Sequence, residues 1–182
     1  MMKIVLTFGL IAGAILAGMM FVTLPFQDAI GFDRGEIIGY TSMIVAFLLI
    51  FFGVKSFRDN VAGGTVTFGR AFAVGAQIAV VASLCYVAAW QVVYYKLAPD
   101  FMEKYGAHVL ETARAEGATE AELAKRKADM DRFAELYKNP FINVGMTFLE
   151  PMPVALVVAL VSAGVLSRRR KEGMLANAVT AP

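Results

Sequence analysis

The sequence predicts an all-α integral membrane protein with four transmembrane helices and an extramembrane helical hairpin between the third and the fourth. The chain is 58% hydrophobic and its mean hydropathy is +0.63, whereas soluble domains are roughly 45–50% apolar. Of its 32 charged residues, 17 fall within residues 96–140. Charge that is gathered into one region and kept out of long apolar segments is typical of a multi-span membrane protein.

Four apolar segments predict the membrane spans, at about residues 4–27, 35–55, 70–95 and 141–167. A helix needs about 20 apolar residues to cross the hydrocarbon, and backbone in lipid must bond internally, so runs of this length are helices. The first segment could alternatively be a secretory signal. We expect it to be retained, because its apolar run is longer than a typical signal core and no small-residue cleavage site follows it.

The charged region predicts a helical hairpin outside the bilayer, at about residues 99–139. A glycine ends its first helix, and the sequence TEAE, from Thr119 to Glu122, is a capping box that starts the second. The hairpin has no long linker on either side. We therefore expect residues 1–171 to form a single membrane domain, followed by a flexible tail at residues 172–182.

Basic residues at the ends of the spans predict the orientation, because short loops rich in lysine and arginine stay in the cytoplasm. They gather at the amino terminus, in the second connection and after the fourth span, at Lys3, Lys55, Arg58, Arg70 and residues 168–171. With four spans, these three places lie on one side. We therefore expect both termini to be cytoplasmic and the protein to lie in the cell (inner) membrane.

Small residues recur at three- and four-residue steps in every span and predict the helix contacts. They are Gly9, Gly13 and Ala17; Gly39, Ser42 and Ala46; Ala71, Gly75, Ala79 and Ser83; and Ala155, Ala159 and Ala163. In lipid, such seams let helix backbones approach closely. Packing of the four spans into one bundle is the simplest use, and a homo-oligomer formed through one seam is the alternative.

The stretch TFLEPMPVAL, residues 147–156, places a glutamate and two prolines inside the fourth span. Pro151 and Pro153 have no amide proton, so the carbonyls four residues earlier lose their helix partners and the span must kink or open. We expect Glu150 to be uncharged and to donate to one of those carbonyls, with Gln77 as a further partner. The alternative is that Glu150 is a proton or cation site in the opening.

No residue pattern predicts a catalytic centre, a metal site or a bound cofactor. His108 is the only histidine, and it has no partner at a zinc-ligand spacing. The glycine-rich stretch GGTVTFGRAF, residues 63–72, precedes a helix and could cradle a phosphate. It lacks a Gly-Lys-Ser/Thr ending, and a tight turn with Arg70 at the lipid headgroups explains it. The net charge of +2 gives no reason to expect a nucleic-acid partner.

Three stretches together resemble one bacterial membrane-protein family. They are FFGVKSFRDNVAGGTVTFGRAFAVG at residues 51–75, YYKLAPDF at 94–101 and TFLEPMPVALVVALVSAGVLSRRRK at 147–171. Their arrangement is similar to the family known as domain of unknown function 4199, over roughly residues 3–171. The resemblance implies a multi-span membrane protein and lends no activity, substrate or catalytic residue. The positions that match its pattern are Arg58, Asp59, Gly64, Phe68, Gly69, Phe72, Glu150 and Pro153.

Two functions fit this sequence. The first is a non-enzymatic structural or accessory protein in the lipid bilayer, whose extracytoplasmic hairpin contacts a membrane or periplasmic protein. The alternative is a small transporter or channel subunit that uses Glu150 as an intramembrane proton or cation site. The candidate functional or structural residues are Glu150, Pro151, Pro153, Gln77, Arg58, Asp59, Gly64, Gly69 and Arg70.

Overall fold

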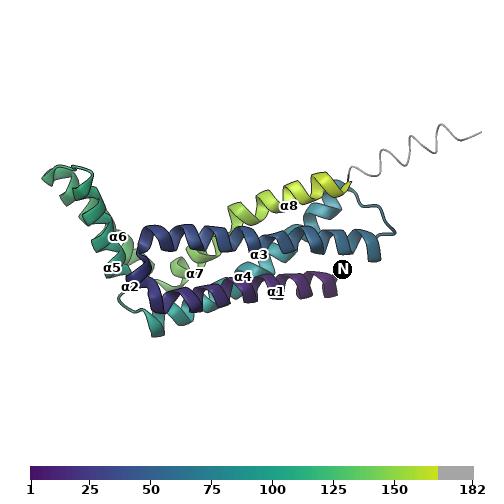
Figure 1. The fold of residues 1–182 in the computed structure, drawn as a ribbon, viewed down its shortest axis with the longest axis horizontal. Helices are drawn as coiled ribbons and strands as arrows, with labels where there is room; N and C mark the ends of the chain where they lie inside the picture. The colour runs from purple at the N-terminus through teal and green to yellow at the C-terminus, as the bar shows by residue number, and fades with distance from the viewer. Residues whose placement is uncertain (168–182) are drawn as a thin grey trace, which may run out of the picture.

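A computed structural model of the chain describes residues 1–167, and every regular element in that range is a helix. The long helices lie along one another as a bundle, and α5 and α6 stand at one end of it (Figure 1). The basic cluster at residues 168–171 and the tail expected at 172–182 lie outside the described residues. The all-helical part of the sequence prediction is therefore confirmed for residues 1–167.

The elements follow one another along the chain with short connections. They are α1 (Met2–Thr23), a 3₁₀ turn (Leu24–Phe26), α2 (Gln27–Ile30), α3 (Phe32–Asn60), α4 (Phe68–Val92), a π-helical turn (Val93–Leu97), α5 (Phe101–Ala115), α6 (Glu120–Tyr137), α7 (Pro140–Leu149) and α8 (Met152–Ser167).

Four helical stretches are long and apolar enough to cross a membrane, as the sequence predicted. They are Met2–Ile30, Phe32–Asn60, Phe68–Leu97 and Pro140–Ser167. The second is longer than the segment expected at 35–55, because α3 continues through polar turns at both of its ends. Length and composition therefore place all four in the class of membrane-spanning helices.

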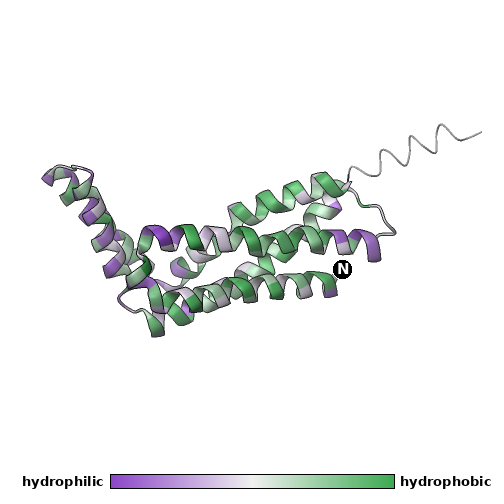
Figure 2. Cartoon of the chain, viewed as in Figure 1, coloured by the Kyte–Doolittle hydropathy of each residue, from purple (hydrophilic) through white to green (hydrophobic). Residues whose placement is uncertain are grey.

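Large apolar side chains cover the outside of the bundle. Leu10, Ile44, Leu48, Leu84 and Val161 are exposed along four different helices. Green, hydrophobic ribbon runs along the bundle, whereas purple, hydrophilic ribbon is concentrated at its ends and on α5 and α6 (Figure 2). Such extensive apolar surface is a liability in water and is suited to lipid.

Local chemistry explains where several helices start. Gly63 and Gly64 have φ angles of 68° and 85° in the turn between α3 and α4, a conformation that residues with a side chain rarely adopt. Thr119 and Glu122 form both hydrogen bonds of the predicted capping box at the start of α6. Asn139 caps α7 by accepting from the amide of Phe141 at 2.9 Å.

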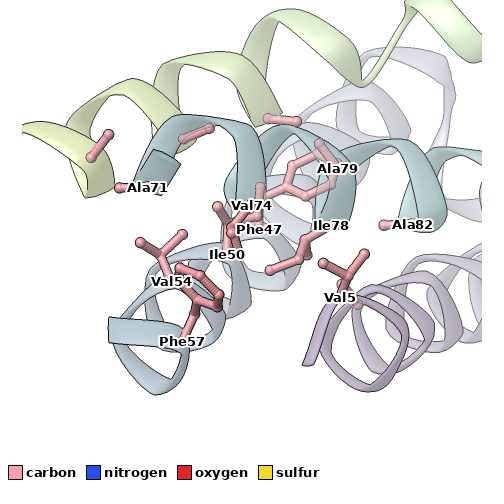
Figure 3. Packing of buried hydrophobic residues seen from close by; sticks show 14 of the residues in the cluster. Val5, Phe47, Ile50, Val54, Phe57, Ala71, Val74, Ile78, Ala79 and Ala82 are labelled. Carbon is pink, nitrogen blue, oxygen red and sulfur yellow. The ribbon is translucent and has the colours of Figure 1, made fainter. Parts of the chain in front are cut away.

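The core fills the half of the bundle that lies away from α5 and α6. Phe47, Ile50 and Phe57 of α3 and Ile78 of α4 are fully buried there. Their side chains pack against one another and against small residues of α4 and α8 (Figure 3). Dispersion contacts of this kind stabilise membrane bundles, because apolar side chains gain little by leaving lipid.

Glycine allows α1 to pack directly on α4. A Cβ atom added to Gly9 would lie 2.6 Å from the Cβ of Val81, and one added to Gly13 would lie 2.5 Å from the Cβ of Cys85. On another face of α4, a Cβ on Gly75 would lie 3.0 Å from the Cβ of Ala159. Three of the four predicted seams therefore serve packing within the chain.

The predicted seam of α3 is used over only part of its length. Ala46 is buried, whereas a Cβ added to Gly39 would meet nothing within 4 Å. Close packing of α3 therefore stops between these two residues. The helices separate at this end of the bundle, and a cleft opens there.

We predict that Gly13→Ala destabilises the protein, although alanine is the better helix former. The added methyl group overlaps Cys85, so α1 and α4 must move apart, at a cost of about 1–3 kcal/mol. The unfolding midpoint in detergent micelles measures this loss. Gly18→Ala is the matched control on the same helix, because a Cβ there meets nothing within 4 Å. Equal stability of the two variants would contradict the packing described here.

Candidate functional site

A cleft of about 710 Å³ lies at the end of the bundle where α3 and α7 separate. It is lined by α3 on one side and by α4 and α7 on the other, and it is bordered by α5 and α6. Its polar and aromatic lining includes Glu36, Tyr40, Tyr86, Trp90, Tyr137 and Glu150. This volume is in the usual range for small-molecule sites, roughly 300–1,000 Å³.

The fourth span breaks where the prolines predicted that it would. α7 ends at Leu149 and α8 begins at Met152, so Glu150 and Pro151 lie between two helices. The amide of Glu150 still donates to the carbonyl of Met146 at 3.0 Å, which completes α7. Pro151 is fully buried at the joint. The break lets α7 leave the line of α8, and this places Glu150 on the cleft.

Tyr86 of α4 is the hydrogen-bond partner of the Glu150 side chain. The Tyr86 hydroxyl donates to Oε2 of Glu150 at 3.1 Å. The expected bond from Glu150 to a backbone carbonyl is not formed within the described residues, and the expected pairing with Gln77 is wrong. Gln77 is exposed and points away from the seam of α4, because it is two residues from Gly75 on a helix with about 3.6 residues per turn.

A second hydrogen-bonded link ties α6 to α4 and α7. Nε1 of Trp90 donates to the hydroxyl of Tyr137 at 2.9 Å, and that hydroxyl lies 3.1 Å from Oγ1 of Thr147. Burial raises the pKa of Tyr137, and either hydroxyl can donate in its contact with Thr147. Tyr94 adds a ring contact to this link, with its ring centre 5.4 Å from that of Tyr137.

Asn143 forms the deepest polar contact of α7. It is fully buried, and its Oδ1 accepts from Nε2 of Gln91 at 2.8 Å. Its Nδ2 has no hydrogen-bond partner within residues 1–167. The Gln91 contact joins the far end of α4 to α7, while Tyr86 joins the same two helices near the proline break.

α5 is held against α2 and the start of α3 by a ring contact and by ion pairs. The His108 ring stacks on Phe32 at 5.1 Å, and its Nε2 lies 2.9 Å from Oδ1 of Asp33. Lys104 bridges Asp100 at 3.1 Å and Asp28 at 3.5 Å, and its hydrogen bond holds the pKa of Asp100 below its usual range. Within the described residues, no group of three or more possible metal ligands surrounds His108.

Four of the candidate residues lie at the opposite end of the bundle, around the turn between α3 and α4. The Arg58 side chain is buried and donates from Nε to Asp59 at 2.6 Å, and its carbonyl accepts from the amide of Gly64 at 2.9 Å. The Arg70 guanidinium lies 5.1 Å from the centre of the Phe57 ring. These contacts fix a turn.

The remaining two candidates, Gly69 and Pro153, are both exposed. The structure therefore does not gather the predicted candidates into one site, and only Glu150 lines the cleft, with Pro151 buried beside it. Sequence analysis missed Tyr86, Tyr137 and Thr147. The sequence could have indicated Tyr86, because it follows Ala79 and Ser83 at helical steps and therefore shares the inward face of α4.

We predict that Glu150→Gln leaves stability nearly unchanged, because glutamine still offers an oxygen to the Tyr86 hydroxyl. Glu150→Leu removes that acceptor and should cost about 1 kcal/mol. Unfolding in micelles, repeated in a Tyr86→Phe background, measures the coupling. The cost of Glu150→Leu should shrink once the hydroxyl is gone. Costs that simply add would show that the two side chains do not interact.

Comparison with known proteins places this architecture in a family. No curated protein and no solved structure matches the chain. Residues 7–168 match the family model described as "Protein of unknown function (DUF4199)". The match covers the four apolar helical stretches, the α5–α6 region and the proline break, and the chain therefore belongs to the DUF4199 family.

Proposed function

We propose that the protein is a non-enzymatic accessory protein of a membrane, and that α5 and α6 form an extramembrane hairpin that binds a partner protein. Family membership alone identifies an uncharacterised membrane protein. The hairpin and its partner are what this proposal adds. A structural role of this kind needs a rigid surface held at a fixed place relative to the bilayer.

The anchoring of α5 and α6 is the observation that carries the proposal. The end of α6 is tied to the bundle by Tyr137 with Trp90, and the middle of α5 is tied to it by His108 with Asp33. Their tip projects away from the bundle (Figure 1). A helix pair that is held firmly at one end, yet packs little of its own length on the bundle, is suited to contact another molecule.

The surface of α6 indicates what kind of partner it suits. Most of its residues are exposed and charges of both signs alternate along it, among them Lys125, Lys127, Asp129, Asp131 and Arg132. Lys127 and Asp131 pair with each other at 2.6 Å across one helical turn. A helix that is polar on nearly all sides often bridges two domains through solvent. Mixed charge favours a protein surface over nucleic acid, which would select a basic patch.

The proposed orientation places the hairpin outside the cytoplasm and both termini inside, in the cell (inner) membrane. Lys55, Arg58 and Arg70 lie on or beside the turn between α3 and α4, at the end of the bundle that also holds the amino terminus (Figure 1). Lysine and arginine in short loops favour the cytoplasmic side.

The transporter alternative receives no support from the packing. Phe47, Ile50 and Phe57 are fully buried and fill the half of the bundle beyond the cleft. A transport route past Glu150 would need these side chains to move. The cleft is thus better suited to holding something at one membrane face than to passing it across.

The experiment combines topology with partner capture. Ala118→Cys, at the turn between α5 and α6, is labelled in intact cells with a membrane-impermeant, photoactivatable thiol reagent, in a Cys85→Ala background. Thr65→Cys, in the exposed turn between α3 and α4, is the matched control. We expect labelling at position 118 alone, followed on illumination by a crosslink to one specific membrane or periplasmic protein.

The crosslinked product distinguishes a partner protein from a homo-oligomer, and the labelling pattern tests the orientation. A crosslink that is lost in Lys125→Glu/Lys127→Glu would show that the charged face of α6 binds the partner. Capture of a second copy of this chain alone would replace the partner by a homo-oligomer. Labelling at position 65 alone would invert the orientation.

A further inference from the structure

The charged side chains of the cleft are unbalanced. The lining contains Asp33, Glu36, Glu116 and Glu150 against His108 and Arg126. Asp33 is already paired with His108 at 2.9 Å. Glu36 and Glu150 form no ion pair within residues 1–167, and both line this cleft. Two carboxyl groups that share a partly enclosed space favour a cation between them.

Aromatic side chains line the same cleft as these two carboxyl groups. Tyr40 lies one helical turn after Glu36 on α3, and Tyr86 bonds Glu150 from α4. Trp90 and Tyr137 line the cleft beyond them. The faces of aromatic rings attract cations within about 6 Å of the ring centre, and rings combined with carboxylates recognise ammonium groups.

Another part of the lining is apolar and adaptable. Leu16 and Met19 of α1, Met43 of α3 and Met146 of α7 all line the cleft. Methionine side chains are flexible and polarisable, so they accommodate hydrocarbon chains of varied shape. The volume of about 710 Å³ is large enough for more than a small headgroup.

From these observations we propose that the cleft is a binding site for an amphipathic cation, a molecule with an ammonium headgroup and a hydrocarbon chain. The headgroup lies between Glu36 and Glu150 against the tyrosine rings, and the chain runs along the methionine-rich wall. An anionic amphiphile is disfavoured there, because the lining carries four carboxyl groups against only His108 and Arg126. This inference does not depend on the partner proposed for the hairpin.

Trp90 is the only tryptophan in the chain and lines the cleft, so its fluorescence reports binding there. The full-length protein in neutral maltoside micelles is titrated with dodecyltrimethylammonium, and separately with dodecyl sulfate, which has the same chain and the opposite charge. We expect a saturable change in Trp90 emission with the cation. The sulfate should give no saturable change at the same concentrations.

Substitutions test whether the two carboxyl groups are the cause of cation binding. Glu36→Gln/Glu150→Gln should weaken the apparent affinity for the cation about tenfold or more. Glu103→Gln is the matched control, because Glu103 is exposed on α5 and does not line the cleft. Far-UV circular dichroism and the unfolding midpoint verify that each variant is folded. Equal responses to cation and sulfate, or a folded double variant with unchanged affinity, would overturn the proposal.

The same reporter identifies the source of the ammonium group. Nanodiscs of phosphatidylglycerol, whose headgroup has no ammonium, are compared with nanodiscs that also contain phosphatidylethanolamine. A change in Trp90 emission with phosphatidylethanolamine, reduced by added dodecyltrimethylammonium, would show that a membrane lipid occupies the cleft. Response to the free amphiphile alone would show that the ligand is a single-chain cation. Response to neither in nanodiscs would overturn the proposal.

Discussion

The size of the side chains along one face of α4 determines how closely α3 and the fourth span can pack on it. From Ala71 through Gly75 and Ala79 to Ser83, this face carries only small residues, and all four are buried. α8 approaches closely there, with the Cβ of Ala159 3.0 Å from where a Cβ on Gly75 would lie. In a bilayer, close approach of this kind replaces the hydrophobic effect as the main source of helix association.

Beyond Ser83 the same face of α4 carries large side chains, and the helices no longer pack closely on it. After Ser83 the next residues along the face are Tyr86 and Trp90, which are far too large for close backbone approach. α7 therefore lies apart from the small-residue seam, and it is held by hydrogen bonds from Tyr86 to Glu150 and from Gln91 to Asn143. The proline break at Pro151 allows α7 to take a different direction from α8.

Much of the fold was predictable because it depends on local chemistry. Span lengths follow from apolar runs, the start of α6 follows from the capping box at Thr119, and the break in span four follows from the missing amide of Pro151. Each of these depends on residues within a few positions of one another. The seam of α4 also follows from spacing alone, because four residues repeat at one helical period.

The partners within the cleft were not predictable in the same way. Gln77 was the predicted partner of Glu150. The rotation of α4 about its axis decides which of its side chains faces α7, and that side chain is Tyr86. Trp90 and Tyr137 are 47 residues apart, so nothing local indicates their bond. Gly39 matched the small-residue pattern of α3, yet it faces no neighbour because its helix end borders the cleft.

The central claim is that the bundle is sealed where the α4 face is small and open where it is large. Single cysteines test it most directly, in a Cys85→Ala background with the protein in nanodiscs, which expose both membrane faces. Ser42→Cys lies in the lining of the cleft, and Ser162→Cys is buried in α8. The rate of reaction with a charged, water-soluble maleimide should be high at position 42 and negligible at position 162. Equal protection of both would show that the cleft is closed, and equal reaction would show that the sealed half is not packed as described.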